Sequence, residues 1–114
     1  NLLENEMNVT KAELVSILAD STGLTKSDVE AVVNGFLYNV IESLGTGDRV
    51  EIRGFGSFYA KEREARLVKN PRTKKVISVD HRFVPVFRPA KQFRENVNKG
   101  LLERKAQMEK DELL

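Results

Sequence analysis

Apolar residues in the N-terminal third of the chain recur at three- and four-residue intervals, which is the spacing of one helix face. Thr10 and Glu13 match a capping box, in which the hydroxyl accepts from a backbone amide and a carboxylate lies three residues on. The apolar positions that follow are Leu14, Ile17 and Leu18. Gly23 suits the left-handed position after a helix. The pattern predicts a first helix between Thr10 and Gly23.

A second helix is predicted almost at once, with Thr25 as its N-cap, Asp28 three residues later and Gly45 at its end. Its apolar stripe comprises Val29, Val32, Val33, Phe36, Leu37, Val40, Ile41 and Leu44. The two helices together predict an αα-hairpin. The stripe is broader than one short partner helix covers. Either the sheet covers the remainder or a second subunit does, and we favour the subunit interface.

The apolar period changes to strict alternation after Gly45, which indicates strands. The strand-like segments are residues 50–52, 57–66, 76–79 and 83–87. They predict an α+β fold, with an antiparallel three-stranded sheet extended into a long β-hairpin arm at about residues 60–81. About ten residues per arm strand at ~3.3 Å each give a reach of about 30 Å. Isolated two-stranded ribbons are marginal in water, so we expect the arm to be mobile until a charged partner orders it.

A third helix is predicted at the C-terminal end of the chain. Pro89 suits its first turn, and Gly100 is a plausible end. Its apolar face comprises Ala90, Phe93 and Val97. Residues 101–114 either extend this helix or form a charged tail. The phenylalanines are expected in the core; they are Phe36, Phe55, Phe58, Phe83, Phe87 and Phe93.

The charge is distributed unevenly along the 114 residues, although the net charge is only +2. Residues 1–48 carry −6, residues 49–94 carry +9 and residues 95–114 carry −1. A contiguous cationic stretch is typical of proteins that bind polyanions. At this length a single core is thin, so a second subunit is a plausible way to bury more apolar surface.

The sequence gives no support for disulfides, catalysis, metal binding or a membrane span. The chain has no Cys, which excludes disulfides and thiolate chemistry. His81 is the only histidine; we expect it at the surface near the base of the arm, without an acid partner or a metal. We therefore expect a non-enzyme with no cofactor, metal or small-molecule substrate. No apolar run approaches the length of a membrane span and no secretory segment is visible, so we expect a cytoplasmic protein, with Met7 as a possible natural start.

The predicted arm tip, residues 69–75, places a proline among four cations. Proline lacks an N–H for a sheet ladder and belongs at a turn or an edge. Three fragments stand in order around this tip: Gly54-Phe55-Gly56-Ser57-Phe58, then Asn70-Pro71, then Val84-Pro85-Val86-Phe87-Arg88-Pro89. With these fragments, the chain from about Met7 to Lys99 resembles the HU and integration host factor family of bacterial DNA-binding proteins.

The resemblance implies an intertwined dimer, either a homodimer or a heterodimer with a paralogue, that organises or compacts the chromosome in the nucleoid. Two β-arms would reach around the minor groove of duplex DNA, and Pro71 would intercalate and bend it. The implied organisation is an extension over residues 1–8, the DNA-binding domain over 9–100 and the tail or helix extension over 101–114. The expected DNA-binding residues are Arg53, Lys61, Arg63, Arg66, Lys69, Asn70, Pro71, Arg72, Thr73, Lys74, Lys75, Arg82 and Lys91. The alternative is a protein-interaction or scaffold module that kept the fold and binds DNA weakly or not at all.

This chain departs from the family pattern at the arm. The family usually has Gly where Lys74 stands, and often Gly at position 68, where this chain has Val68. A positive φ at Lys74 would cost on the order of 1 kcal/mol. Arg63, Arg66 and Lys69 follow at every third position, so a regular strand turns Arg66 to the face opposite the other two.

Overall fold

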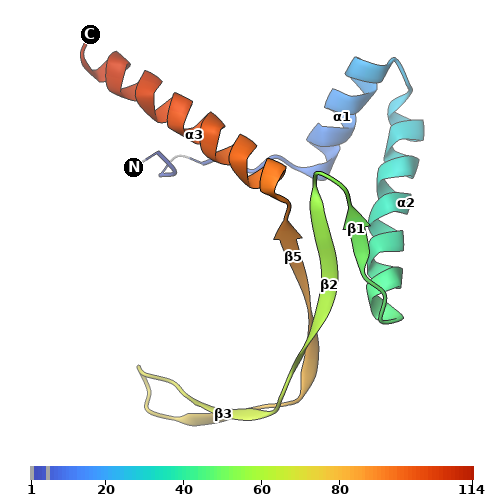
Figure 1. Cartoon of the computed structure of the whole chain (residues 1–114), viewed down its shortest axis with the longest axis vertical. Helices are drawn as coiled ribbons and strands as arrows, with labels where there is room; N and C mark the ends of the chain where they lie inside the picture. Colours follow the sequence, from blue (N-terminus) through green and yellow to red (C-terminus); the bar gives the residue numbers. More distant parts are fainter. Residues whose placement is uncertain (1, 5) are drawn as a thin grey trace. The chain divides into compact units, whose positions relative to one another are not determined.

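The computed structural model describes residues 2–4 and 6–114, which fold into three helices and five strands (Figure 1). The elements in chain order are α1 (Lys11–Thr22), α2 (Lys26–Gly45), β1 (Val50–Ile52), β2 (Gly56–Arg63), β3 (Arg66–Lys69), β4 (Val76–Val79), β5 (Arg82–Pro89) and α3 (Lys91–Glu112). The chain divides into two compact units, residues 1–41 with 94–114, and residues 42–93. Within the described part of the chain, no helix has the length and apolarity that crossing a bilayer requires.

The predicted capping residues mark the ends of both N-terminal helices. The Thr10 hydroxyl accepts a hydrogen bond from the Glu13 backbone amide at 3.2 Å, and Gly23 ends α1 in the left-handed region with φ 77°. The Thr25 hydroxyl accepts from the Asp28 amide at 3.1 Å in the same way. Each contact satisfies a backbone amide that has no partner inside its own helix, so the predicted αα-hairpin is confirmed.

The core between α1 and α2 is small. Val15, Ala19 and Val29 are its buried members, and Val33 packs against them. A hydrogen bond of 2.8 Å from Lys11 Nζ to Asn34 Oδ1 also joins the two helices. A core of this size stabilises a domain only weakly, because the free energy gained scales with the apolar area removed from water.

Much of the apolar stripe of α2 is exposed in the single chain. Val32 keeps 70% of its surface accessible, Phe36 48% and Ile41 68%. A contiguous exposed apolar stripe of this kind marks an interaction surface. The exposure supports the second of the two alternatives drawn from the sequence, a subunit interface.

The second unit is built on an antiparallel sheet in the order β1-β2-β5. Four aromatic rings pack together at one end of it, and their centroids lie between 4.8 and 6.4 Å apart: Phe55, Phe58, Phe87 and Phe93. Gly56 lies against this cluster, since a Cβ there would stand 2.6 Å from Phe87 Cε1 and from the Arg88 carbonyl oxygen. The connection from β1 to β2 through Gly54, Phe55 and Gly56 is therefore set by packing at Gly56 and by a positive φ of 82° at Gly54.

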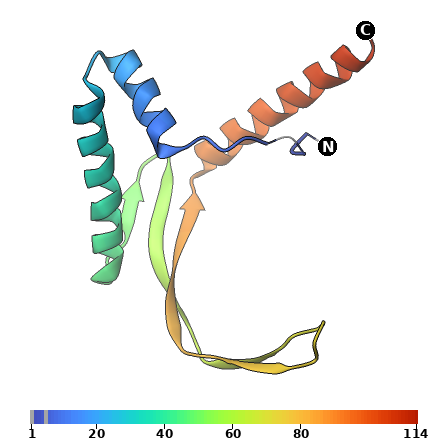
Figure 2. The same cartoon turned by 180° about the vertical axis from the view of Figure 1, so that it is seen from behind.

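The arm continues from β2 and β5 as the separate two-stranded ribbon β3–β4 (Figures 1 and 2). The sheet pairing ends at Arg63 and Arg82 and resumes at Arg66 and Val79. The interruption takes residues 64–65 from one strand and 80–81 from the other. Each strand loses two residues, so the register is unchanged and no bulge is inserted. The predicted arm is present, but its ladder has a joint in the middle.

Two sequence expectations about these elements are wrong, and one open alternative is decided. Helix α3 continues through Gly100 to Glu112, so residues 101–112 extend the helix rather than form a tail, because one glycine costs only about 1 kcal/mol inside a helix of good helix formers. Pro89 is the last residue of β5, paired with Gly56, and does not lie in the first turn of α3. None of the six phenylalanines is buried: four of them are exposed, Phe36 by 48%, Phe55 by 42%, Phe83 by 63% and Phe87 by 36%, and the other two are half-buried.

Candidate nucleic-acid interface

Hydrogen bonds centred on Asn70 hold the tip of the arm in shape, and the Thr73 hydroxyl adds one by accepting from the Lys75 amide at 3.4 Å. The Asn70 amide donates to the Lys75 carbonyl, and the Asn70 carbonyl accepts from the Lys74 amide, both at 2.8 Å. The side-chain oxygen of Asn70 accepts from the amides of Arg72 and Thr73 at 2.9 and 3.4 Å. This is an Asx-type turn, in which a short amide side chain takes the place of a backbone acceptor. The tip therefore has a defined conformation supplied by its own sequence.

Pro71 is exposed within this turn, directly after Asn70. Its pyrrolidine ring fixes its own φ, and the hydrogen bonds of Asn70 hold the residues on either side. Lys74 completes the turn with φ 64° and is the one non-glycine with positive φ among the described residues. The tip thus presents a stiff apolar ring next to cations, with backbone strain at Lys74.

The Asn70 contacts also determine which atom of its side chain remains for a ligand. Two backbone amides donate to Oδ1, which identifies this atom of the side chain as the oxygen. The Nδ2 group is then the part of the side chain that can donate a hydrogen bond to a ligand. The minor groove offers acceptors, N3 of adenine and O2 of thymine. A donor beside Pro71 matches this pattern, as does the Arg72 guanidinium.

The expected site residues fall into four places in the structure. Arg53 lies in the turn after β1 and not on a strand, and Lys91 is the first residue of α3. Arg82 opens β5 and is half-buried. The remaining members lie on the arm or at its tip, and all but the half-buried Asn70 are exposed: Lys61, Arg63, Arg66, Lys69, Asn70, Pro71, Arg72, Thr73, Lys74 and Lys75.

The two faces of the β3–β4 ribbon both carry cations. Cross-strand partners share a face, and faces alternate along a strand, so Arg66 and Lys69 lie on opposite faces, as their spacing predicts. Apolar side chains accompany them: Leu67 is 74% exposed and Ile77 53% exposed. These exposed apolar residues were missed in the sequence, although a ribbon without a core behind it must expose both faces.

The amide of Ala90 is not free to bind an anion, because it donates to the Phe55 carbonyl at 2.9 Å.

Arg49 and Arg88 add positive charge to the second unit without having been expected in the site. The Arg49 guanidinium lies over the Tyr59 ring, 4.9 Å from its centroid, and 3.9 Å from a Glu51 oxygen. Its contacts within the sheet make Arg49 a poorer phosphate ligand than the arm residues.

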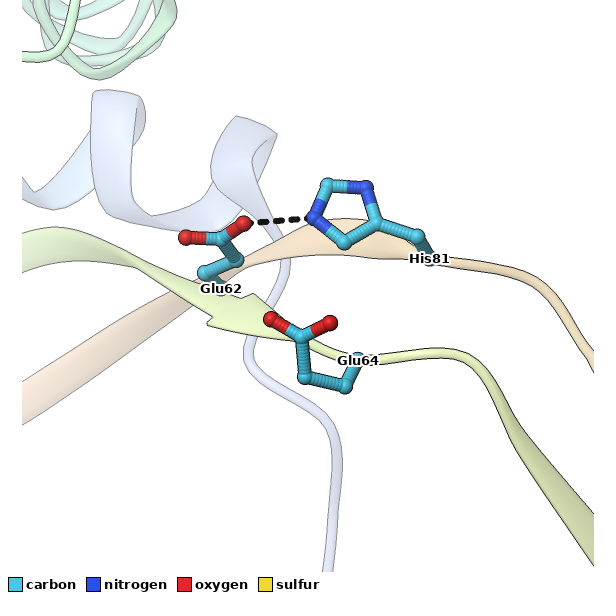
Figure 3. Close-up of side chains that lie close together, drawn as sticks. All are labelled: Glu62, Glu64 and His81. Carbon is cyan, nitrogen blue, oxygen red and sulfur yellow. Dashed lines mark hydrogen bonds and ion pairs between the residues drawn. The ribbon is translucent and has the colours of Figure 1, made fainter.

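The expectation that His81 lacks an acid partner is wrong. His81 Nε2 lies 2.6 Å from Glu62 Oε2, and Glu64 lies close by, two residues after Glu62 along the chain (Figure 3). The sequence held a usable signal. Pairing the strands about the tip places residue 81 opposite residue 64, and residues 62 and 64 share a face.

The fold and the site define a class of protein: a small α+β protein whose sheet carries an exposed, proline-tipped cationic hairpin. The family model described as bacterial DNA-binding protein matches residues 9–98. The chain is 43% identical to DNA-binding protein HU of Clostridium pasteurianum over 91 residues, which are 80% of this chain and 100% of that protein. It is also 43% identical to integration host factor subunit beta of Vibrio atlanticus over 94 residues, 82% of this chain and 100% of that protein.

Solved structures agree with these relatives. A cocrystal structure of Anabaena HU with DNA matches with a TM-score of 0.71 and 39% identity, covering 78% of this chain and 97% of that one. HU from Thermotoga maritima matches with a TM-score of 0.56 and 29% identity, over 78% of this chain and 98% of that one. The chain belongs to the family of bacterial DNA-binding proteins that includes HU and integration host factor.

Proposed function

We propose that this protein is an architectural DNA-binding protein, in which two chains grip duplex DNA with their β-arms and bend it. The observation that carries the proposal is the exposed Pro71, held in a fixed turn by Asn70 and surrounded by exposed cations. Family membership supports the same function, and the cocrystal relative is itself an HU–DNA complex.

The arm has the chemistry that minor-groove binding needs. Lys and Arg side chains on both faces of the ribbon can reach the phosphates on the two rims of a groove. Nδ2 of Asn70 and the guanidinium of Arg72 are donors for the acceptors on the groove floor. Exposed apolar side chains such as Leu67 and Ile77 fit against the sugars between them.

Pro71 is the proposed wedge. An apolar ring inserted at a base step partly unstacks it and costs a few kcal/mol, and the larger protein surface that the bent duplex covers offsets this cost. The intercalation mechanism comes from the family, for which it is a described mode of binding. What this chain adds is a tip whose ring direction is fixed by hydrogen bonds.

The functional unit we propose is a dimer. Only Val15, Ala19 and Val29 are buried hydrophobic residues among those described, and the α2 stripe is exposed. Two chains would bury the stripe and place two arms on one duplex. Both a homodimer and a heterodimer with a paralogue satisfy this requirement.

We further propose that the protein associates with the nucleoid and has no catalytic role. The basis is its family, whose members are DNA-binding proteins rather than enzymes. Fluorescence microscopy of a tagged copy should show the signal coincident with DNA and not spread through the cell.

Binding and bending of a duplex labelled for energy transfer, at two salt concentrations, test the proposal. A protein that neutralises ~6–10 phosphates should lose about 10³–10⁵ in affinity between 50 and 200 mM salt. Pro71→Ala should reduce the bend more than the affinity, whereas Lys69→Ala should lower the affinity on all sequences alike. Salt-independent binding would favour a scaffold role, and an unchanged bend in Pro71→Ala would remove the intercalation step.

A further inference from the structure

The joint of the arm carries a cluster of donor atoms unrelated to DNA binding. Glu62, Glu64 and His81 each offer one ligand atom, and these atoms all lie within 4.8 Å of one another (Figure 3). The three residues come from the two strands of the ribbon, at the point where β2 and β5 stop pairing. We propose that they form a surface site for a divalent transition-metal ion of the zinc class.

The strand geometry explains why these three side chains converge. Glu62 and Glu64 are two residues apart, so their side chains project from the same face of the strand. The register that pairs Arg63 with Arg82 places His81 opposite Glu64. Alternation turns Lys61, Arg63 and Arg82 to the other face. Arg66 shares the face of the carboxylates but makes no ion pair with them in the described part of the chain.

The charges of the cluster are unbalanced without a cation. His81 contacts Glu62 at 2.6 Å, but the Glu64 carboxylate makes no hydrogen bond or ion pair in the described part of the chain. Two carboxylates on one face repel each other, and the contact with His81 involves only one of them. A divalent ion placed between the three groups would compensate both.

The donor set indicates the class of metal. One imidazole and two carboxylates are typical ligands of Zn²⁺ and its neighbours, whereas Mg²⁺ and Ca²⁺ favour oxygen alone. Bonds of about 2.0–2.1 Å place donor atoms about 3.3 Å apart in a tetrahedral site. The metal ion would take the place of the proton between His81 Nε2 and Glu62 Oε2, and this proton would leave to solvent. The His81–Glu62 pair would open slightly and Glu64 would close in. Water would complete the coordination.

The side chains are free to make this adjustment. His81 is 46% and Glu62 54% exposed, and the one ring that His81 meets among the described residues is the edge-on Phe83, with the centroids 5.4 Å apart. A bound ion would link the two strands where backbone pairing is interrupted at residues 64–65 and 80–81. It would therefore act as a clamp that stiffens the joint, an effect that can be measured without DNA.

The test uses the full chain without a histidine tag, so that His81 supplies the only imidazole signals in the NMR spectrum. Zn²⁺ should shift the His81 ring resonances in a saturable way, Mg²⁺ should not, and Co²⁺ should give visible d–d absorption. Glu64→Gln should weaken Zn²⁺ binding by at least about tenfold. Zn²⁺ should also slow amide exchange at residues 64–65 and 80–81.

Glu51→Gln is the matched control, because Glu51 is an exposed carboxylate of the same sheet outside the cluster. It should bind Zn²⁺ like the parent protein. Unshifted His81 resonances at saturating Zn²⁺, or equal affinity in Glu64→Gln and Glu51→Gln, would overturn the proposal. Because the titration needs no DNA, its failure would leave the proposed DNA binding untouched.

Discussion

Lys74 shows how one residue sets the conformation and the strain of the arm tip. Its φ of 64° lies in the left-handed region, where a Cβ approaches the following carbonyl oxygen. The position is required because the Lys74 amide donates to the Asn70 carbonyl and closes the turn. The strain anticipated from the sequence is therefore present, and the Asn70 hydrogen bonds hold it in place.

Replacing this residue should relieve the strain. Lys74→Gly should stabilise the tip by about 1 kcal/mol, because glycine adopts the left-handed region freely. Amide hydrogen exchange at residues 70–76 in the absence of DNA measures the change. Lys75→Gly removes the same charge without a positive φ and should give no such protection. Equal protection in both variants would show that charge, and not φ, is responsible.

Gly56 is fixed by packing rather than by its φ. Gly56→Ala should destabilise the protein by about 1–3 kcal/mol, since the added methyl group overpacks the Phe87 ring and the Arg88 carbonyl. Thermal unfolding followed by circular dichroism measures it. Gly45→Ala serves as the control because nothing lies within 4 Å of a Cβ at that position. A melting temperature in Gly56→Ala as high as in the parent would contradict the packing argument.

At the scale of elements, α3 shows which of the two alternatives for the C-terminal residues holds. It continues through Gly100 to Glu112, beyond residue 98, where the family match ends. A helix with few buried residues depends on its own propensity, since packing contributes little. No residue of α3 is buried, so its one glycine, Gly100, should lower the stability of the helix by its full propensity cost.

Gly100→Ala should raise the helicity of the C-terminal part of α3. The expected gain is about 1 kcal/mol of local helix stability, because alanine loses less backbone entropy and the Cβ meets no atom within 4 Å. Hydrogen exchange of residues 101–112 measures it. Gly100→Pro is the opposing variant and should unwind the segment. Equal exchange in parent and alanine variant would mean that tertiary packing, not propensity, holds this segment.

The arm illustrates what an element-level pattern can and cannot specify. Alternation and the turn residues predict a hairpin and the opposite faces of Arg66 and Lys69. They do not predict the joint at residues 64–65 and 80–81, because nothing in the local pattern marks where a ladder without a core behind it ceases to pair. The strand register, unchanged through the joint, sets the neighbourhood of His81, which the expectation drawn from the sequence left without a partner.

At the scale of the whole molecule, the exposed apolar stripe of α2 favours the association of two chains into a dimer. Phe36→Glu should raise the dissociation constant of the dimer by more than about tenfold, because a charge buried in an apolar interface carries its full desolvation cost. Sedimentation at several concentrations measures it. Tyr38→Glu is the matched control, since two residues along a helix turn the side chain far from the Phe36 face.

A dimer that survives Phe36→Glu unchanged, or that is lost equally in Tyr38→Glu, would place the interface elsewhere. The same variants bear on DNA binding. A monomer brings one arm to the duplex, so loss of the dimer should weaken DNA binding without altering the tip. This separates the contribution of association from that of Pro71.

The amino-acid sequence alone determined the local features of this protein. Caps at Thr10 and Thr25, the glycine after α1 and the proline within a basic turn act over a few residues, so their consequences follow from local sterics and hydrogen bonding. Charge distribution and ordered motifs were enough to indicate the family. These are the parts of the fold and of the site that need no knowledge of distant contacts.

Only the tertiary structure decided which distant residues meet. Pairing of β2 with β5 brought Glu62 to His81, placed Phe87 over Gly56 and assigned Pro89 to a strand. It also left Phe36 and Phe83 exposed. Such outcomes depend on register and on the balance of buried area between alternative packings. Those quantities belong to the assembled chain and are not encoded in any short stretch of it.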